Sequence, residues 1–411
     1  MTRGTFVVLG GGLAGATAVA TLRNEGFDGR LVLIGAEHLP PYERPPLSKG
    51  YLRGEQAAER IAVRPEKWFG DQEIETRFGE TASALDLGAG SVALSDADPI
   101  RFDALLLATG SRARRPAIPG ADLSGVFDLR TLPDADEIRA AARQGARAAL
   151  VGMGFIGAEL AASLRSLGVE VTTIEHGKVP LRRAVGPEVG RVIEGLHRDH
   201  GVTMHLGRSV EGFDGAGRLE AVLLDENERV EADFAVVGIG AVPNAEIGAD
   251  LGLGVDRGIL VDAQLRTIDP RIYVAGDIAT HDHPVFGRIR VEHFDNALRS
   301  AEAAARNMLG AGEPYSDPHW FWSDQYDMNL QLAGITTGYD DFVVRGSLEE
   351  RSFAGFYLRD GVLIAAVSVN RAHDVRRSMR PIGRRVRPER SQLEDPEFDL
   401  RTLVPKRADR G

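Results

Sequence analysis

The chain has 411 residues, of which 43% are hydrophobic and 27% are charged, and its formal net charge is −11. A single core stops growing at roughly 250 to 300 residues, so this length predicts two or three domains. The sequence contains no cysteine, which excludes disulfides, cysteine-ligated metal centres and a redox-active dithiol, while the negative charge argues against nucleic acid as a partner.

Neither a membrane span nor a cleavable signal is expected from the sequence. No run approaches the roughly 18 apolar residues that cross a bilayer. Residues 1–12 pass directly into a strand-like segment and a glycine turn, which leaves no room for the charged and apolar regions of a signal. We therefore expect a cytoplasmic protein.

The first predicted unit reads as a strand, a glycine turn, a helix and a second strand over residues 5–37. Gly10, Gly12 and Gly15 have GxGxxG spacing, and Glu37 follows the second strand. Such glycines let the backbone approach a pyrophosphate at a helix N-terminus, and the acid accepts a ribose hydroxyl. A glycine turn can also serve packing alone, but the full strand and helix context predicts a dinucleotide site.

The segment "LPPYERPPLSKGYL", residues 39–52, follows that second strand. Proline fixes its own φ and biases the preceding residue towards extended conformations. Pro45 and Pro46 therefore predict a stiff arm, which would hold the charge of Lys49 at a fixed place. A solvated surface lysine is the plainer alternative.

A second copy of the glycine pattern follows over residues 147–176, with Gly152, Gly154 and Gly157 in the turn. Glu175 ends its second strand, where a carboxylate favours an unmodified ribose and repels a 2′-phosphate. The site should therefore prefer NADH to NADPH. Lys178, Arg182 and Arg183 follow and could instead accept a phosphate.

Four further motifs are present: "LLLATGS" (105–111), "VVGIGAVPN" (236–244), "RIYVAGDIA" (271–279) and "WFWSDQY" (320–326). The first three read as strands that end in turns of the two predicted units, and the fourth begins the last segment of the chain. With "RPPLSK" (44–49), they resemble the FAD-dependent, NADH-linked ferredoxin reductases that serve cytochrome P450 and Rieske-type oxygenase systems. The resemblance covers essentially the whole chain.

The resemblance implies an α/β fold with two Rossmann-like, glutathione-reductase-like dinucleotide-binding domains and a C-terminal α+β domain. The implied boundaries are 1–113 and 245–320 for a discontinuous FAD domain, 114–244 for the NADH domain and 321–411 for the C-terminal domain.

The resemblance implies catalytic roles for Lys49, Phe155, Glu159 and Trp322. Lys49 would be a cation beside the flavin, paired with Glu159, and Phe155 would cover the flavin; from the residues alone, Glu159 could serve only its helix dipole and Phe155 only the core. The motifs and the resemblance together assign these cofactor-binding residues: Gly10, Gly12, Ala14, Gly15, Glu37, Arg44, Lys49, Ala82, Thr109, Gly110, Arg130, Gly152, Gly154, Ile156, Gly157, Glu159, Glu175, Arg183, Gly240, Gly276, Asp277, Glu292, Phe294 and Trp322.

Two qualifications apply to the predicted cofactor contacts. Asp277 would accept hydrogen bonds from the ribityl chain of FAD, although "DIATHD" could also place it at a helix N-cap. The family often has a glutamine where this chain has Ser300, so one expected hydrogen bond to the cofactor is in doubt.

The absence of cysteine limits the routes by which electrons can leave the flavin. FAD accepts two electrons from NADH and can release them singly, and without a dithiol they must pass directly to a separate acceptor. We expect a [2Fe-2S] ferredoxin, docking near the eight arginines of residues 371–390, although these could also form a solvated helix and loop. The alternatives are an NADH oxidase or small-acceptor reductase, and an NADH-sensing interaction protein similar to apoptosis-inducing factor.

No metal site is expected. His281, His283 and His293 lie close in sequence, but "HDHP" reads as a loop and no third ligand follows at metal-like spacing.

Overall fold

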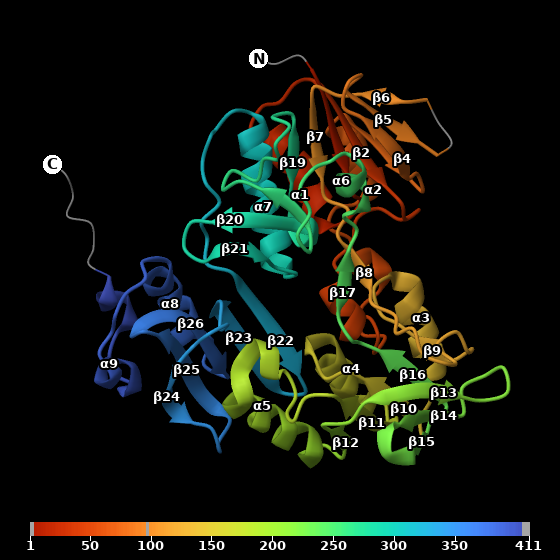
Figure 1. The fold of residues 1–411 in the computed structure, drawn as a ribbon, viewed down its shortest axis with the longest axis vertical. Helices are drawn as coiled ribbons and strands as arrows, with labels where there is room; N and C mark the ends of the chain where they lie inside the picture. Colours follow the sequence, from red (N-terminus) through yellow and green to blue (C-terminus); the bar gives the residue numbers. More distant parts are fainter. Residues whose placement is uncertain (1–3, 96–97, 405–411) are drawn as a thin grey trace. The chain divides into compact units, whose positions relative to one another are not determined.

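The computed structural model describes residues 4–95 and 98–404. Its internal contacts divide the chain into two compact units, each of which is assembled from separate stretches of sequence (Figure 1). The first unit comprises Met1–Glu43, Ala58–Arg112 and Val242–His319, and the second comprises Arg44–Ala57, Ala113–Ala241 and Trp320–Gly411.

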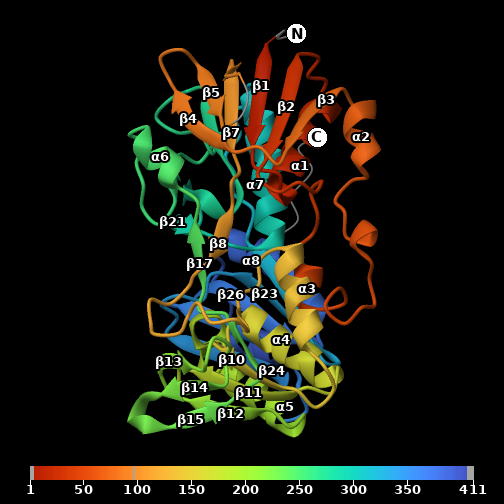
Figure 2. The same cartoon turned by 90° about the vertical axis from the view of Figure 1, so that its right-hand side faces the viewer.

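The first unit is built on a parallel sheet of five strands in the order β19-β7-β1-β2-β3 (Figure 2). Strands β1, β2, β7 and β19 are mainly apolar and mostly buried, as expected for a parallel sheet with both faces covered, whereas the edge strand β3 is mixed in polarity and buries only Ile74. Helices α1 and α7 pack against each other beside the sheet. The bounds are β1 Thr5–Leu9, β2 Arg30–Gly35, β3 Ile74–Phe78, β7 Ala104–Leu107, β19 Ile272–Val274, α1 Leu13–Asn24 and α7 Phe294–Met308.

Two three-stranded sheets and several short helices complete the first unit. The sheets are β4-β5-β6 and β18-β20-β21. The bounds are β4 Ala82–Asp86, β5 Ser91–Leu94, β6 Ile100–Arg101, β18 Ile259–Val261, β20 Ala279–His283, β21 Gly287–Arg290, α2 Glu66–Asp71, α6 Glu246–Asp250, and the 3-10 helices η2 Ala58–Arg60 and η4 Gly276–Ile278.

The second unit begins with another parallel sheet, in the order β12-β11-β10-β16-β9. Helix α3 starts with a capping box between Thr131 and Asp134, and α5 is kinked at Gly186, whose φ is 75°. The bounds are β9 Val126–Phe127, β10 Arg147–Val151, β11 Glu170–Glu175, β12 Thr203–Leu206, β16 Phe234–Val237, α3 Leu132–Ala141, α4 Phe155–Ser166 and α5 Arg182–Asp199.

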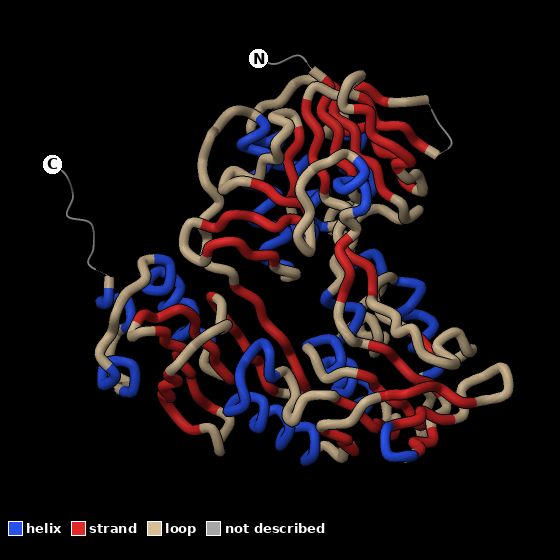
Figure 3. Tube along the Cα trace, in the orientation of Figure 1, coloured by secondary structure: helices blue, strands red, loops and turns tan. Residues whose placement is uncertain are grey.

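An antiparallel sheet in the order β22-β23-β26-β25-β24 forms the C-terminal part of the second unit, and α8 packs on its strands β23 and β26 (Figure 3). The bounds are β22 Trp320–Gln325, β23 Met328–Gly334, β24 Asp341–Ser347, β25 Ser352–Arg359, β26 Val362–Val369, α8 Ala372–Gly383, α9 Arg390–Glu394 and η5 Leu400–Leu403. The unit also contains a small sheet of β13 Val210–Asp214, β14 Ala221–Leu224 and β15 Arg229–Glu231, with η3 Asp225–Asn227.

Strands β8 (Ser111–Ala113) and β17 (Ala241–Pro243) pair with each other and contain the points where the chain passes from one unit to the other. The predicted fold class is confirmed: two parallel α/β sheets and a C-terminal antiparallel sheet with helices. The three-domain boundaries stay a prediction, and residues 44–57 pack with the second unit. No helix among the described residues has the length and apolar character needed to cross a bilayer.

The proline segment does not have the extended backbone that proline favours in the residue before it. Residues Pro45–Ser48 form a 3-10 helix, η1, and Arg44 before it has helical angles, with φ −82° and ψ −29°. Lys49 ends this turn, and its backbone N–H donates to the Pro46 carbonyl at 2.9 Å. The bias that proline places on the preceding residue is overcome here by the tight turn.

Candidate functional site

The first glycine turn contains two crowded glycines and one open one. A Cβ on Gly10, whose φ is 135°, would lie 2.1 Å from the Ala108 carbonyl oxygen, and one on Gly15 would lie 1.9 Å from that of Gly10. Gly12 caps α1, and a Cβ there would meet nothing within 4 Å. Packing therefore requires the outer glycines, while the middle one leaves space at a helix N-terminus that fits a pyrophosphate.

The second turn has the same construction in the second unit. A Cβ on Gly152 would lie 2.5 Å from the Gly238 carbonyl oxygen, and one on Gly157 would lie 2.0 Å from that of Gly152. Gly154 caps α4 and again has open space beside it. Each unit thus has a cradle that fits a dinucleotide phosphate.

Exposed apolar side chains surround the second cradle. Strands β10 and β16 are parallel neighbours, so the segments after them share one edge of the sheet. Ile156 is 43% exposed and Ile239 is 38% exposed at this edge. Gly240 is exposed with a φ of 110°, and Arg183 is exposed near the start of α5. The carboxyl edge of a parallel sheet is where such folds bind their ligands.

The two acidic residues predicted to contact ribose have different environments. The Glu37 carboxylate accepts a 2.5 Å hydrogen bond from the Tyr42 hydroxyl. The Glu175 carboxylate accepts from the Met153 N–H at 2.7 Å and from the Gly177 N–H at 2.6 Å. Glu175 is therefore fixed by backbone groups beside the second glycine turn, with lone pairs left for a ribose hydroxyl.

Asp277 lies in η4, after strand β19 of the first unit. Its carboxylate accepts from the Ser111 hydroxyl at 3.1 Å, and its carbonyl accepts from the Arg290 guanidinium at 3.0 Å. The N-cap of η4 is Ala275, so the alternative that Asp277 caps a helix is not what the structure shows.

Ser300 supports the neighbouring turn. Its hydroxyl accepts from the Gly276 N–H at 2.9 Å and donates to the Asn296 carbonyl at 2.5 Å. Gly276 has a φ of 73°, and a Cβ there would lie 3.3 Å from that of Ala14. The structure thus brings Ala14 of the glycine turn next to the turn that contains Asp277.

The remaining predicted residues of the first unit are placed as follows. Thr109 and Asn244 exchange two hydrogen bonds of 2.9 Å, and Gly110 has a φ of 66°. Glu292 forms a 2.6 Å ion pair with Arg290. Phe294 begins α7, and Ala82 begins β4.

The predicted ion pair between Lys49 and Glu159 is confirmed, with 2.5 Å between Nζ and Oε2, and both side chains lie in the second unit. Glu159 is 6% exposed, and it also accepts from the Ser48 hydroxyl at 2.5 Å and the Ser323 hydroxyl at 2.7 Å. Its position two residues after Gly157 had placed Glu159 in the first turn of the helix. Because α4 begins at Phe155, Glu159 lies in the second turn instead.

A buried chain of hydrogen bonds continues from this carboxylate. The Gln325 amide donates to Ser323 at 3.1 Å, and its oxygen lies 3.0 Å from His197 Nε2. The Tyr326 hydroxyl lies 3.3 Å from His197 Nδ1. Burial lowers the pKa of His197 to about 4, so this imidazole is neutral at pH 7.

Sequence reasoning missed Ser48, Ser323, Gln325 and His197. Part of the signal was present in "FWSDQY", because Ser323 and Gln325 alternate along β22 and therefore point to one face of the strand. Their connection to Glu159 crosses about 160 residues of sequence, and no local pattern encodes it.

The predicted aromatic and arginine residues of the second unit form contacts with their own neighbours. Phe155 packs edge-to-face on Phe321, with ring centroids 4.4 Å apart. Trp322 stacks on Trp320 at 5.4 Å. Arg44 donates to the backbone carbonyl of Arg130. These contacts fix the side chains, and their roles towards a cofactor stay predictions.

Comparison with known proteins shows the family. Residues 4–306 match the model of the pyridine nucleotide-disulphide oxidoreductase family, and residues 320–404 match a reductase C-terminal model. Rhodocoxin reductase of Rhodococcus erythropolis is 38% identical over 407 residues, which cover 98% of this chain and 95% of that protein. The ferredoxin–NAD(+) reductase component of an anthranilate 1,2-dioxygenase system of Burkholderia cepacia is 38% identical, covering 98% of this chain and all of that protein.

The structure is also similar to solved ones. The reductase chain in a covalent putidaredoxin reductase–putidaredoxin complex has a TM-score of 0.95 and is 33% identical, covering 98% of each chain. The ferredoxin reductase for the CYP199A2 system from Rhodopseudomonas palustris has a TM-score of 0.94 and is 37% identical, covering 98% of this chain and all of that one.

Proposed function

The chain belongs to the pyridine nucleotide-disulphide oxidoreductase family, and on that premise we propose that it is an NADH-dependent ferredoxin reductase that uses FAD. The observation that supports this most directly is the pair of glycine cradles, one in each unit, in a chain without cysteine. FAD, when bound, links two-electron exchange with nicotinamide to one-electron exchange with an iron–sulfur acceptor.

The first unit is proposed to bind FAD through the turn at Gly12, with Asp277 and Glu37 as the acceptors for its hydroxyl groups. Ser111 and Tyr42 hold these two carboxylates by donating hydrogen bonds to them. Gly276 and the neighbouring Ala14 are both small, so they leave room for the cofactor at this point.

The second unit is proposed to bind NADH at the turn of Gly154, with Glu175 at the adenosine ribose. A fixed carboxylate repels a 2′-phosphate, which supports a preference for NADH over NADPH. Lys49 is proposed to place a positive charge at the reacting end, and Glu159, with its two serine donors, holds the ammonium group in one position.

Electrons are proposed to leave directly for a separate protein. The family name refers to a disulphide, but this chain has no cysteine to form one. The similar proteins include reductases of dioxygenase systems and a reductase solved in complex with putidaredoxin. We propose a [2Fe-2S] ferredoxin of a cytochrome P450 or Rieske-type oxygenase system as the acceptor, and a cytoplasmic location.

The test is electron transfer from NADH by the FAD-loaded protein to a panel of [2Fe-2S] ferredoxins, with oxygen alone as the comparison. The proposal expects rapid reduction of at least one ferredoxin and slow consumption of NADH in air. Oxygen consumption as fast as the best ferredoxin reaction would show an oxidase instead. NADH binding that changes oligomer size without turnover would show a sensor.

A further inference from the structure

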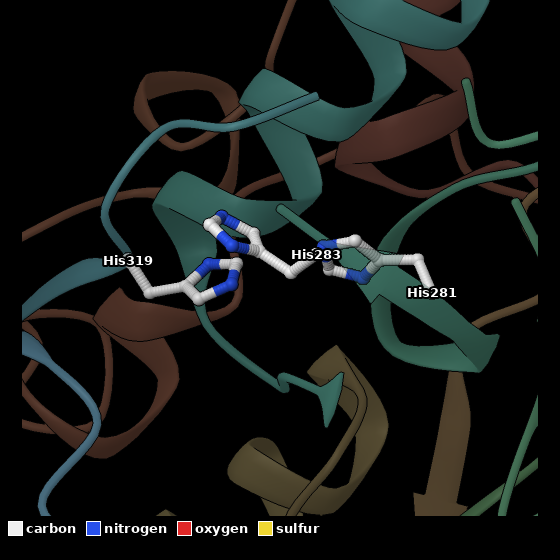
Figure 4. Close-up of side chains that lie close together, drawn as sticks. All are labelled: His281, His283 and His319. Carbon is white, nitrogen blue, oxygen red and sulfur yellow. The ribbon is translucent and has the colours of Figure 1, made fainter. Parts of the chain in front are cut away.

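Three buried histidines meet in the first unit, at a place that the proposed function does not use. His281 and His283 lie two residues apart on β20, and His319 lies just before β22 (Figure 4). One ring nitrogen from each histidine lies within 4.8 Å of the other two. All three side chains are at most 2% exposed. The sequence predicted a loop here with no third ligand at metal-like spacing, but His281 and His283 lie on strand β20 and His319 joins them from a distant part of the sequence.

Three of the six ring nitrogens in this cluster are buried without a hydrogen-bond partner. Within residues 4–95 and 98–404, neither Nδ1 nor Nε2 of His319 has one, and neither does Nε2 of His281. A buried polar atom without a partner costs free energy, and such atoms in native proteins often mark an ion or a water that completes the site. Three of them in one cluster therefore point to a bound ligand.

His283 is held in one orientation by its surroundings. Its Nδ1 accepts from the N–H groups of Val285 and Phe286, at 3.0 and 3.3 Å, so Nε2 carries the proton and donates to the Asp317 carbonyl at 3.1 Å. A backbone carbonyl that receives one N–H of an imidazole is the usual way to fix a metal-binding histidine. A metal at Nδ1 would compete with two backbone donors, which limits its affinity.

Ring packing alone leaves these nitrogens unexplained. The three imidazole centroids are 5.3 to 5.7 Å apart, and Tyr315 and Phe286 pack against them. Aromatic carbon would pack as well without burying polar atoms. Burial also lowers the pKa of His281 to about 4 and that of His319 to about 2, so both are neutral, the form that binds a metal.

We propose that His281, His283 and His319 bind one divalent transition-metal ion, with Zn²⁺ as the expected ion. Imidazole ligands suit zinc, copper and nickel, whereas magnesium and calcium require oxygen ligands. Zn–N distances of about 2.0 to 2.1 Å require the three nitrogens to move slightly together from their present separation. The metal would join β20 to the segment before β22, a link of two parts of the first unit that are distant in sequence.

The experiment uses the FAD-loaded protein after removal of metals with a chelator and dialysis. Equilibrium dialysis against Zn²⁺, with the metal counted by mass spectrometry, should give one zinc per chain. The midpoint of thermal unfolding should rise with Zn²⁺ and not with Mg²⁺. Wild-type protein that retains no zinc would overturn the proposal, whatever the variants do.

Two ligand variants and one matched control test the location. His319→Phe and His281→Phe keep an aromatic ring in place of the imidazole and should weaken zinc binding at least tenfold, since each removes one ligand. His373 on α8 has a side chain that is 57% exposed, and His373→Phe should leave zinc binding unchanged. Equal losses in all three variants, or binding that persists in both ligand variants, would contradict the site.

Discussion

The Glu159 carboxylate shows how a charge is kept in a nearly buried place. Lys49 supplies the opposite charge, and the hydroxyls of Ser48 and Ser323 supply two further donors. A buried charge is tolerated only when it is paired and hydrogen-bonded in this way. The same contacts fix the ammonium group, so the pair can act as a positioning device for charge.

Lys49→Ala should slow reduction of the FAD-loaded protein by NADH at least tenfold, equal to about 1.4 kcal/mol, while FAD content changes little. The reason is that the variant removes the fixed positive charge but none of the glycine cradle. Stopped-flow absorbance at the flavin band measures the rate. Lys67→Ala, at an exposed lysine of α2, is the control, and an unchanged rate in Lys49→Ala would remove the proposed role.

Glu175→Gln should reduce the preference for NADH over NADPH by at least about tenfold, because like charges placed together in a binding site cost several kcal/mol. The amide keeps the size of the side chain and one acceptor oxygen for the backbone of the turn. The ratio of kcat/KM for the two nucleotides measures the effect. Glu170→Gln, at the exposed start of the same strand, should keep the wild-type ratio, and the same ratio in Glu175→Gln would place specificity elsewhere.

At the scale of secondary-structure elements, features encoded by local sequence patterns were predicted, whereas contacts between residues distant in sequence were not. The glycine turns follow from residues that are neighbours in sequence, so both were found with their strands and helices. The 3-10 turn at Pro45 was missed, since Arg44 adopts helical angles against the usual bias before proline. The third histidine of the cluster was missed because His319 reaches β20 only through the fold.

Arg345 of β24 and Arg390 of α9 each form polar contacts between these two elements, and the two arginines differ in burial. Arg345 is 1% exposed and donates to Asp374 and to the carbonyls of Gln392 and Leu393. Arg345→Ala should lower the free energy of unfolding by about 3 to 5 kcal/mol, because it leaves Asp374 buried with fewer partners. Urea denaturation measures this.

Arg390 is the matched control for that change. It pairs with Asp341 of the same strand, but its side chain is 55% exposed, and exposed pairs contribute little. Arg390→Ala should therefore leave the urea midpoint nearly unchanged. Similar urea midpoints for Arg345→Ala and Arg390→Ala would show that burial of the arginine does not determine its contribution to stability.

Helix α8 presents the basic surface proposed for docking. Arg376 is exposed and Arg377 partly exposed, whereas Arg371 is bound to Asp374 at 2.7 Å. Opposite charges on two proteins raise their association rate. The double variant Arg376→Glu and Arg377→Glu should slow ferredoxin reduction at low salt at least tenfold, with NADH–ferricyanide turnover unchanged.

The control for docking is Arg143→Glu, at an exposed arginine that follows α3. It changes net charge by the same sign without touching α8, so it should affect ferredoxin reduction only slightly. Equal slowing of ferredoxin and ferricyanide reactions in the α8 variant would mean that the substitutions disturb the enzyme and not the docking.

For the whole molecule, the fold and the family were predictable and the site only partly so. The two repeated glycine motifs predicted the two dinucleotide-binding units, whereas the C-terminal α+β domain and the Lys49–Glu159 pair were expected from the resemblance. The supporting residues Ser323, Gln325 and His197 were not, because their hydrogen bonds join β22, α4 and α5. Such contacts depend on how elements pack, which sequence periodicity does not specify.

The buried histidines should make the whole protein sensitive to acid. The pKa of His197 is lowered by burial to about 4, whereas an unfolded chain gives about 6.5. Between these values the unfolded state binds more protons, so the free energy of unfolding falls as pH falls, by up to about 1.4 kcal/mol per pH unit for this one residue.

His197→Gln should therefore show a shallower fall in the urea midpoint between about pH 6.5 and 4 than the wild-type protein. Gln cannot take up the proton, and the other buried histidines titrate equally in both proteins, so the difference isolates His197. Above about pH 6.5 the two curves should run parallel, separated only by the lost packing. His373→Gln, at an exposed histidine, should keep the wild-type slope. Identical slopes for His197→Gln and wild type would mean that His197 is not neutral in the folded state or does not govern acid unfolding.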